Sequence, residues 1–186
     1  MTTIPTPPTA RKEPKETMIH GVALTDDYAW LREKEDPEVT AYVARVLCEF
    51  SEPDSLYQVH DSLGQPIQDL DEMIKASDPV HGNARSFDVE RAVRKQIGNY
   101  ALFVAGMYPE AIDAGRYPRR LHLGDLIRAG KESFFIVSQF NLFEYEEEAP
   151  MFSRLSECFE RWILGLTLAR EDMGPNRPAL PAPPRD

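Results

Sequence analysis

Four histidines supply the side chains best suited to bind a metal ion or to move a proton near neutral pH: His20, His60, His81 and His122. None of them stands in an H-E-x-x-H motif or in the E-x-x-H motif of a di-iron bundle. Asp78 and His81 share the loop "SDPVHGNARS", and His60 could approach them. Imidazole and carboxylate groups are common metal ligands. His60, Asp78 and His81 are therefore the candidate metal ligands, although surface histidines explain them more simply, and we expect no cofactor.

A group of carboxylates could do acid and base chemistry. Asp69, Asp71 and Glu72 lie close together in sequence and could form an acid/base cluster. Asp69 and Glu72 also have the spacing of a capping box, in which an N-cap side chain and the third residue of a helix bond to each other's backbone. A capped, solvated helix start explains the group better, so we assign no catalytic residue.

Nucleophile and phosphate motifs are missing from the sequence. A nucleophile elbow needs Gly-x-Ser-x-Gly, whereas Ser133, Ser138 and Ser156 lie in "GKESFF", "FIVSQF" and "SRLSECF". Gly98 and Gly130 are too isolated to form a phosphate-binding loop. Several aromatic side chains could line an apolar pocket, but packing in a core is the simpler interpretation for them: Tyr100, Phe103, Tyr108, Phe134, Phe135 and Phe140.

Composition limits the class of partner. The chain has 186 residues, 42% of them hydrophobic, which is enough for one domain with a proper core. Its net charge of -10 and its pI of about 4.9 disfavour nucleic acid and anionic membrane surfaces as partners. A local basic cluster could bind an anion, although a solvated face explains it more simply: Arg116, Arg119, Arg120, Arg128 and Lys131.

The sequence also predicts where the protein works. Its N-terminus has no apolar core of a signal peptide, and no apolar run approaches the roughly 18 residues that span a bilayer. Cys48 and Cys158 each lie in an apolar helical pattern, which predicts reduced, buried thiols, with a bridge between them as the alternative. We therefore expect a soluble cytoplasmic protein.

Apolar spacing predicts an all-α fold, a compact bundle of about five helices with an extended N-terminal arm and a Pro-rich C-terminal tail. The predicted domains are a flexible tail and arm over 1–35, a helical domain over 36–172 and a disordered tail over 173–186. "SLYQVHDSLGQPI" is a short hairpin or an irregular helix turn, and "EYEEE" joins the next helix or stays a solvated loop. The predicted helices cover 37–51, 69–76, 86–108, 121–141 and 150–171.

The long helix over 86–108 is capped by Ser86. Its glycine, Gly98, costs about 1 kcal/mol against alanine in a helix, so we expect it to permit a close helix crossing. The residues predicted to face the core are Val89, Val93, Ile97, Tyr100, Ala101, Val104 and Met107.

A segment near the N-terminus resembles part of a known enzyme family. "PPTARKEP", then His20-Gly21, "DDYAWLR" and "DPEVTAYV" are similar in order to the N-terminal segment of the prolyl oligopeptidase family, most of all its oligopeptidase B branch. The resemblance covers about 7–43 and implies a segment that precedes a β-propeller and packs on a catalytic domain. That catalytic domain supplies the nucleophile, acid and base of the family, so none of this chemistry comes to the present residues. Tyr28, Trp30 and Leu31 offer apolar anchors for a packing arm.

From about 44 to 172 the chain is similar to an uncharacterised group of small helical bacterial proteins, on "ARVLCEF", "LYQVHDSLGQPIQDLDEMI", "SFDVERAVRKQIGNYALFVAGMYPEAI" and "GKESFFIVSQF". The favoured function is a non-catalytic helical domain of the bacterial cytoplasm that acts through an unknown protein partner or as a homo-oligomer. One alternative is a ligand- or metal-binding protein or enzyme that uses His60, Asp78 and His81 or an aromatic pocket. A second is an inactive remnant of a serine oligopeptidase N-terminus.

Overall fold

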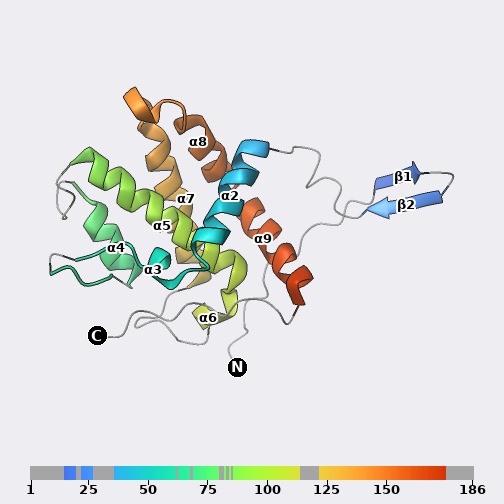
Figure 1. Cartoon of the computed structure of the whole chain (residues 1–186), viewed down its shortest axis with the longest axis horizontal. Coiled ribbons are helices and arrows are strands. Elements are labelled where there is room, and N and C mark those ends of the chain that lie inside the picture. The colour runs from blue at the N-terminus through green and yellow to red at the C-terminus, as the bar shows by residue number, and fades with distance from the viewer. Residues whose placement is uncertain are drawn as a thin grey trace. The chain divides into compact units, whose positions relative to one another are not determined.

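A computed structural model of the chain describes residues 15–19, 22–26, 36–61, 63–67, 69–79, 82, 84, 86–113 and 122–174 (Figure 1). Contacts divide the chain into two units, Met1–Pro37 and Glu38–Asp186. The first unit contains the antiparallel strands β1 (Lys15–Ile19) and β2 (Val22–Asp26), in which Lys15 pairs with Asp26 and Ile19 with Val22. The sequence predicted a flexible tail and arm over 1–35 and did not indicate the hairpin. Only two residues separate its strands, a spacing typical of β-hairpins.

The second unit, which we call the helical body, confirms the all-α bundle. Aside from one isolated bridge between His60 and Pro66, its regular structure over the described residues is helical. The elements are α2 (Pro37–Glu49), α3 (Pro53–Leu56), α4 (Leu70–Ser77), α5 (Phe87–Met107), α6 (Pro109–Asp113), α7 (Leu123–Gln139), the 3-10 helix η1 (Phe143–Tyr145), α8 (Ala149–Glu157) and α9 (Phe159–Met173). Among the described residues, no helix is both long and apolar enough to cross a membrane.

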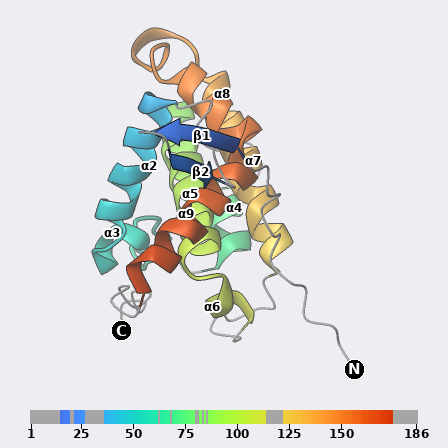
Figure 2. The same ribbon diagram turned by 90° about the vertical axis from the view of Figure 1, so that its right-hand side faces the viewer.

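Helix α5 runs through the middle of the helical body, with α2, α4, α7 and α9 around it (Figures 1 and 2). It begins where predicted, because Ser86 Oγ accepts a hydrogen bond from the Val89 N–H at 3.3 Å. Residues 96–107 are all buried, so this half of α5 has no outward face. The predicted single stripe is therefore wrong in detail: Val89 is 41% exposed and Val93 only partly buried, while Ile97 is fully buried.

Glycines permit the closest helix crossings, as predicted for Gly98. A Cβ atom built on Gly98 would overlap the ring of Phe134 on α7. A Cβ on Gly130 of α7 would lie 2.6 Å from Ala101 Cβ and would also overlap Phe159. Because Gly98 meets Phe134 while Ala101 meets Gly130, the two helices run antiparallel, and the start of α5 lies beside the end of α7.

Helix α2 covers the core with one apolar face. Its buried side chains and the residue that follows the helix are Val39, Tyr42, Val43, Val46 and Phe50. The prediction of two buried cysteines is wrong, because Cys48 is exposed and Cys158 is half-buried, although both are free thiols. Position 48 follows position 46 by about 200° around a helix, which turns it away from that buried face.

Two helices replace the single helix predicted over 150–171. Helix α8 ends and α9 begins at Cys158, whose φ of -108° and ψ of 23° are not helical. The break lets side chains from both helices pack on one ring, since the centroids of Phe152 and Phe159 lie 5.6 and 5.8 Å from that of Phe134. No proline or glycine marks this position in the sequence, so the break depends on tertiary packing.

Candidate functional site

The candidate metal ligands are placed only in part. His60 is exposed, and its Nδ1 donates a hydrogen bond to the Gln58 carbonyl oxygen at 2.8 Å. Asp78 ends α4 and is half-buried, with its backbone N–H donating to the Lys75 carbonyl at 3.2 Å. His81 lies outside the described residues. Within the described part of the chain, no group of three or more His, Cys, Asp or Glu side chains could hold a metal ion. The metal site of His60, Asp78 and His81 therefore stays a prediction.

The predicted carboxylate group forms the start of α4. Asp69 Oδ1 accepts a hydrogen bond from the Glu72 N–H at 3.1 Å, which is the predicted N-cap. Asp71 and Glu72 are exposed in the first turn, where negative charge favours the helix dipole. This geometry stabilises a helix end.

The aromatic candidates divide between core and surface. Tyr100, Phe103, Tyr108 and Phe134 are at most 4% exposed and belong to the core, whereas Phe135 is 54% exposed. The six aromatics therefore do not line one pocket together. Phe135 is the exposed member of the set, and Phe140, which follows α7, is half-buried.

A polar cluster joins the start of α5 to the turn before α8. Arg91 is 7% exposed, and its guanidinium donates to Glu148 Oε2 at 2.7 Å while it lies 3.9 Å from the ring centroid of Tyr145. Tyr145 Oη donates to Asp88 Oδ1 at 2.9 Å. Lys95 adds a second contact to Glu148, at 3.4 Å. The acidic segment "EYEEE" is therefore a turn held by ionic contacts, a role that neither sequence alternative contained.

The pKa values in this cluster describe a structural ion pair. Burial alone would raise the pKa of Glu148, but the hydrogen bond from Arg91 and the charge of Lys95 outweigh it and hold that pKa below its ordinary value. Burial lowers the pKa of Lys95. Because the opposite charges are paired and hydrogen-bonded, we interpret the cluster as a clamp between helices and not as a catalytic site.

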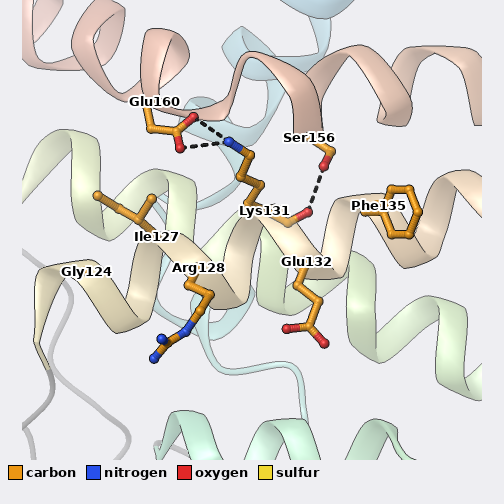
Figure 3. Close-up of a pocket in the computed structure, with 8 residues that line it drawn as sticks. All are labelled: Gly124, Ile127, Arg128, Lys131, Glu132, Phe135, Ser156 and Glu160. Carbon is orange, nitrogen blue, oxygen red and sulfur yellow. Dashed lines mark hydrogen bonds and ion pairs between the residues drawn. The ribbon is translucent and has the colours of Figure 1, made fainter.

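A groove along α7 is the candidate functional site (Figure 3). The hollow has a volume of about 500 Å³ and is open to solvent. Gly124 and Phe135 mark its ends in Figure 3, and Ser156 and Glu160 come from α8 and α9. We call this surface the α7 groove; it is lined by Gly124, Ile127, Arg128, Lys131, Glu132, Phe135, Ser156 and Glu160.

Ionic contacts fix one side of the α7 groove. Lys131 Nζ donates to both carboxylate oxygens of Glu160, at 2.8 and 3.1 Å, and Ser156 Oγ donates to the Lys131 carbonyl at 2.9 Å. Burial alone would raise the pKa of Glu160, yet the hydrogen bond from Lys131 keeps that pKa below its ordinary value. These contacts join α7 to α8 and α9 and give the groove a fixed wall.

The other side of the α7 groove carries both signs of charge. Arg128 and Glu132 extend away from Glu160, toward the same side of α7 (Figure 3). Arg128 pairs with Asp125, and its side chain is 74% exposed. Arg128 and Lys131 were members of the predicted basic cluster, while Arg116, Arg119 and Arg120 lie outside the described residues.

Sequence reasoning missed the α7 groove because its walls come from separate elements. Phe135 and Lys131 are more than 20 positions before Ser156 and Glu160. The available signal was Phe135, an apolar residue on a helix whose core face is already supplied by Leu126, Phe134 and Val137. Ile127 is partly buried and packs against that core. Apolar side chains outside the core face of a helix are candidates for contact with a partner.

A second exposed apolar group lies at the end of the helical body where α5 begins. Phe87 is 71% exposed, Leu142 66% and Phe143 87%. Phe143 also has a φ of 56°, an unusual backbone conformation for a residue other than glycine. The Tyr145 to Asp88 hydrogen bond holds this turn beside the start of α5.

Comparison with known proteins agrees with the N-terminal resemblance. The family model for the prolyl oligopeptidase N-terminal β-propeller domain matches residues 7–46, which include β1, β2 and the first part of α2. The match covers under a quarter of the 186 residues and includes no part of the α7 groove. Neither a curated protein nor a solved structure matches the chain.

Proposed function

We propose that the helical body acts through contact with another protein along the α7 groove. The observation that carries this proposal is Phe135, a large apolar side chain that is 54% exposed beside a hollow of about 500 Å³. Aromatic anchors next to concave surfaces are typical of the residues that dominate protein interfaces. The charged side chains around Phe135 supply the polar rim that such interfaces have.

The chemistry of the groove favours a protein over other partners. A small-molecule site encloses most of its ligand, whereas the α7 groove is open to solvent. Nucleic acid is disfavoured by the net charge of -10, which repels phosphate. The apolar end near Phe143 is a weaker candidate, because the charged wall formed by the Lys131 to Glu160 pair belongs to the α7 groove.

We also propose that the protein works in a reducing compartment and without peptidase chemistry. Its two cysteines are free, which agrees with the cytoplasm. The matched family model is that of the N-terminal propeller domain, whereas peptidase chemistry in the resembled family belongs to another domain. Ser156 and Ser138 donate hydrogen bonds to helix carbonyls, at 2.9 and 2.6 Å, and not to a catalytic base.

The proposal is tested by the size of the complex that contains the chain in extracts of cells that express it. Size-exclusion chromatography of wild type should show elution ahead of the monomer. Phe135→Ser should return the chain to the monomer position, because it removes the apolar anchor. Leu63→Ser is the matched control, since Leu63 is 83% exposed and does not line the groove. Monomeric elution of wild type both in extracts and when the purified chain is loaded at about 1 mM, or equal behaviour of the two variants under both conditions, contradicts the proposal.

A further inference from the structure

We propose that the partner in the α7 groove is a second copy of this chain, packed against it as an antiparallel pair of α7 helices. This inference rests on the proposed function, because it names the occupant of the same groove. The charge pattern of α7, the placing of its apolar residues and the ion pair of Lys131 each support it.

The charges on the exposed side of α7 are complementary to themselves. Arg128 and Glu132 are one helical turn apart and extend to the same side (Figure 3). In a twofold pair of antiparallel helices, the Arg128 of one copy faces Glu132 of the second copy, and the same contact recurs on the other side of the axis. The axis of that arrangement passes near position 130, midway between Arg128 and Glu132.

The apolar residues are placed about nearly the same axis. Ile127 and Phe135 flank position 131, so the twofold pair brings Phe135 of each copy toward Ile127 of the other. Positions 130 and 131 differ by one residue, about 1.5 Å along the helix. A single axis therefore satisfies the ionic and the apolar contacts together. Gly124 has no side chain and so adds no bulk to this surface, which is open at that point, since a Cβ atom there would have no neighbour within 4 Å.

In this arrangement Lys131 of one copy would lie close to Lys131 of the second copy, near the twofold axis. The repulsion between the two ammonium groups is relieved by an ion pair within each copy. The ammonium group of Lys131 is bound to both oxygens of Glu160, at 2.8 and 3.1 Å, on the side away from Arg128. The carboxylate neutralises the charge and draws the side chain away from the axis. An ion pair in this position is compatible with a homodimer interface, in which the same surface of both copies is in contact.

The expected dimer is weak. Helix α7 has 17 residues and is about 25 Å long. One pair of such helices buries less than roughly 1,200 Å² of accessible surface, and protein complexes with interfaces of that size are usually transient. The net charge of -10 on each copy opposes association, and about 0.15 M salt screens it. Measurements must therefore reach protein concentrations of about 1 mM.

Exchange of charges between copies tests the geometry. Sedimentation equilibrium of the full chain should show a dimer that Arg128→Glu and Glu132→Arg each weaken about tenfold or more, because each creates two like-charge contacts. When these two single variants are mixed, they should form a heterodimer at least as tight as wild type, since every contact between copies is then attractive. The double variant R128E/E132R should regain the wild-type dimer. Both side chains are exposed, so circular dichroism should show unchanged helix content in every variant.

The outcomes separate this inference from the proposed function. Wild type that stays monomeric to about 1 mM, or single variants that fail to associate when mixed, overturns the second copy as occupant. The proposed function then stands or falls on the Phe135→Ser elution in cell extracts. If the complex in cell extracts contains a different protein, the groove is still a contact surface, and that protein is its partner in place of the second copy.

Discussion

The ring of Phe134 on α7 fills the space that Gly98 on α5 leaves empty. A Cβ atom at position 98 would overlap three carbon atoms of that ring. Phe134 is fully buried and also packs against Tyr42, Phe152 and Phe159, so its ring cannot move aside without disturbing three other helices. The α7 groove therefore lies on a helix whose position this contact in the core helps to fix.

Gly98→Ala is expected to destabilise the protein, although alanine favours helices over glycine by about 1 kcal/mol. Overpacking of a close-packed core costs about 1–3 kcal/mol, and here it outweighs the gain in helix propensity. Thermal and urea unfolding followed by circular dichroism measure the difference. Gly165→Ala on α9 is the control, because a Cβ atom there has no neighbour within 4 Å. It should stabilise the fold by about 0.5–1 kcal/mol, and equal effects at the two positions contradict the crossing geometry.

Ile97→Ala should lower the free energy of unfolding by about 2–5 kcal/mol, because Ile97 is fully buried at the centre of α5. Val89→Ala, at a position 41% exposed on the same helix, should cost less than about 0.5 kcal/mol. Urea titrations of both variants check the pair. Similar losses at the two positions would mean that α5 is rotated about its axis relative to the arrangement described.

Glu148→Gln tests the clamp of Arg91 and Lys95 through its dependence on pH. The folded-state pKa of Glu148 lies below its ordinary value, so the ionised carboxylate stabilises the fold at neutral pH, and that stabilisation is lost as the pH falls through the folded-state pKa. The variant should lose about 1 kcal/mol at pH 7, because the side chain is 42% exposed and partly screened. The difference from wild type should vanish once the pH falls below the folded-state pKa, which lies beneath the ordinary value of a glutamate.

Glu160 provides the comparison for that measurement. The hydrogen bond from Lys131 lowers the pKa of Glu160 as well. Because Glu160 is unchanged in the Glu148 variant, the free energy of unfolding of that variant should still fall partly with falling pH. Unfolding free energies measured from pH 3 to 8 separate the contributions, with Gln replacing each carboxylate in turn. A Glu148→Gln difference that grows toward low pH contradicts the ion pair.

Removal of residues 1–35 should leave the helical body folded. The contacts of the chain divide it at Pro37, and the buried face of α2 lies beyond that point. A chain that begins at Asp36 should keep its helical content and melting temperature to within about 3 °C. A chain that begins at Glu52 should not fold, because it lacks Val39, Tyr42 and Val46, each worth about 1.5–3 kcal/mol of burial. Unfolding on loss of residues 1–35 alone would make the N-terminal unit part of the helical body.

Local signals in the sequence predicted the features that depend on neighbouring residues. Asp69 and Ser86 cap their helices as expected, because an N-cap bonds to the backbone only three residues away. Helical spacing predicted helices where α2 and α8 lie, and Gly98 was correctly tied to a helix crossing. These features need no knowledge of the rest of the fold.

Features that depend on distant residues were not predictable in this way. The break at Cys158 arises because Phe152 and Phe159 both pack on Phe134. No local sequence motif predicts that packing. The second half of α5 is buried on every side because several helices surround it. The charged first half of the same helix is typical of an ordinary amphipathic helix, so the sequence did not indicate this burial. The contact of Arg91 with Glu148 joins residues 57 positions apart. The α7 groove likewise needs α8 and α9 in place before it exists.

Photo-crosslinking from position 135 tests the role of the α7 groove most directly. A photoreactive phenylalanine analogue replaces Phe135, and a second chain carries it at Leu63, an exposed apolar position that does not line the groove. After irradiation of living cells, we expect a discrete protein adduct from position 135 and none from position 63, with peptides of α7 itself in the adduct if the partner is a second copy. Absence of any adduct at position 135, or identical adducts at both positions, would contradict a protein partner in the α7 groove.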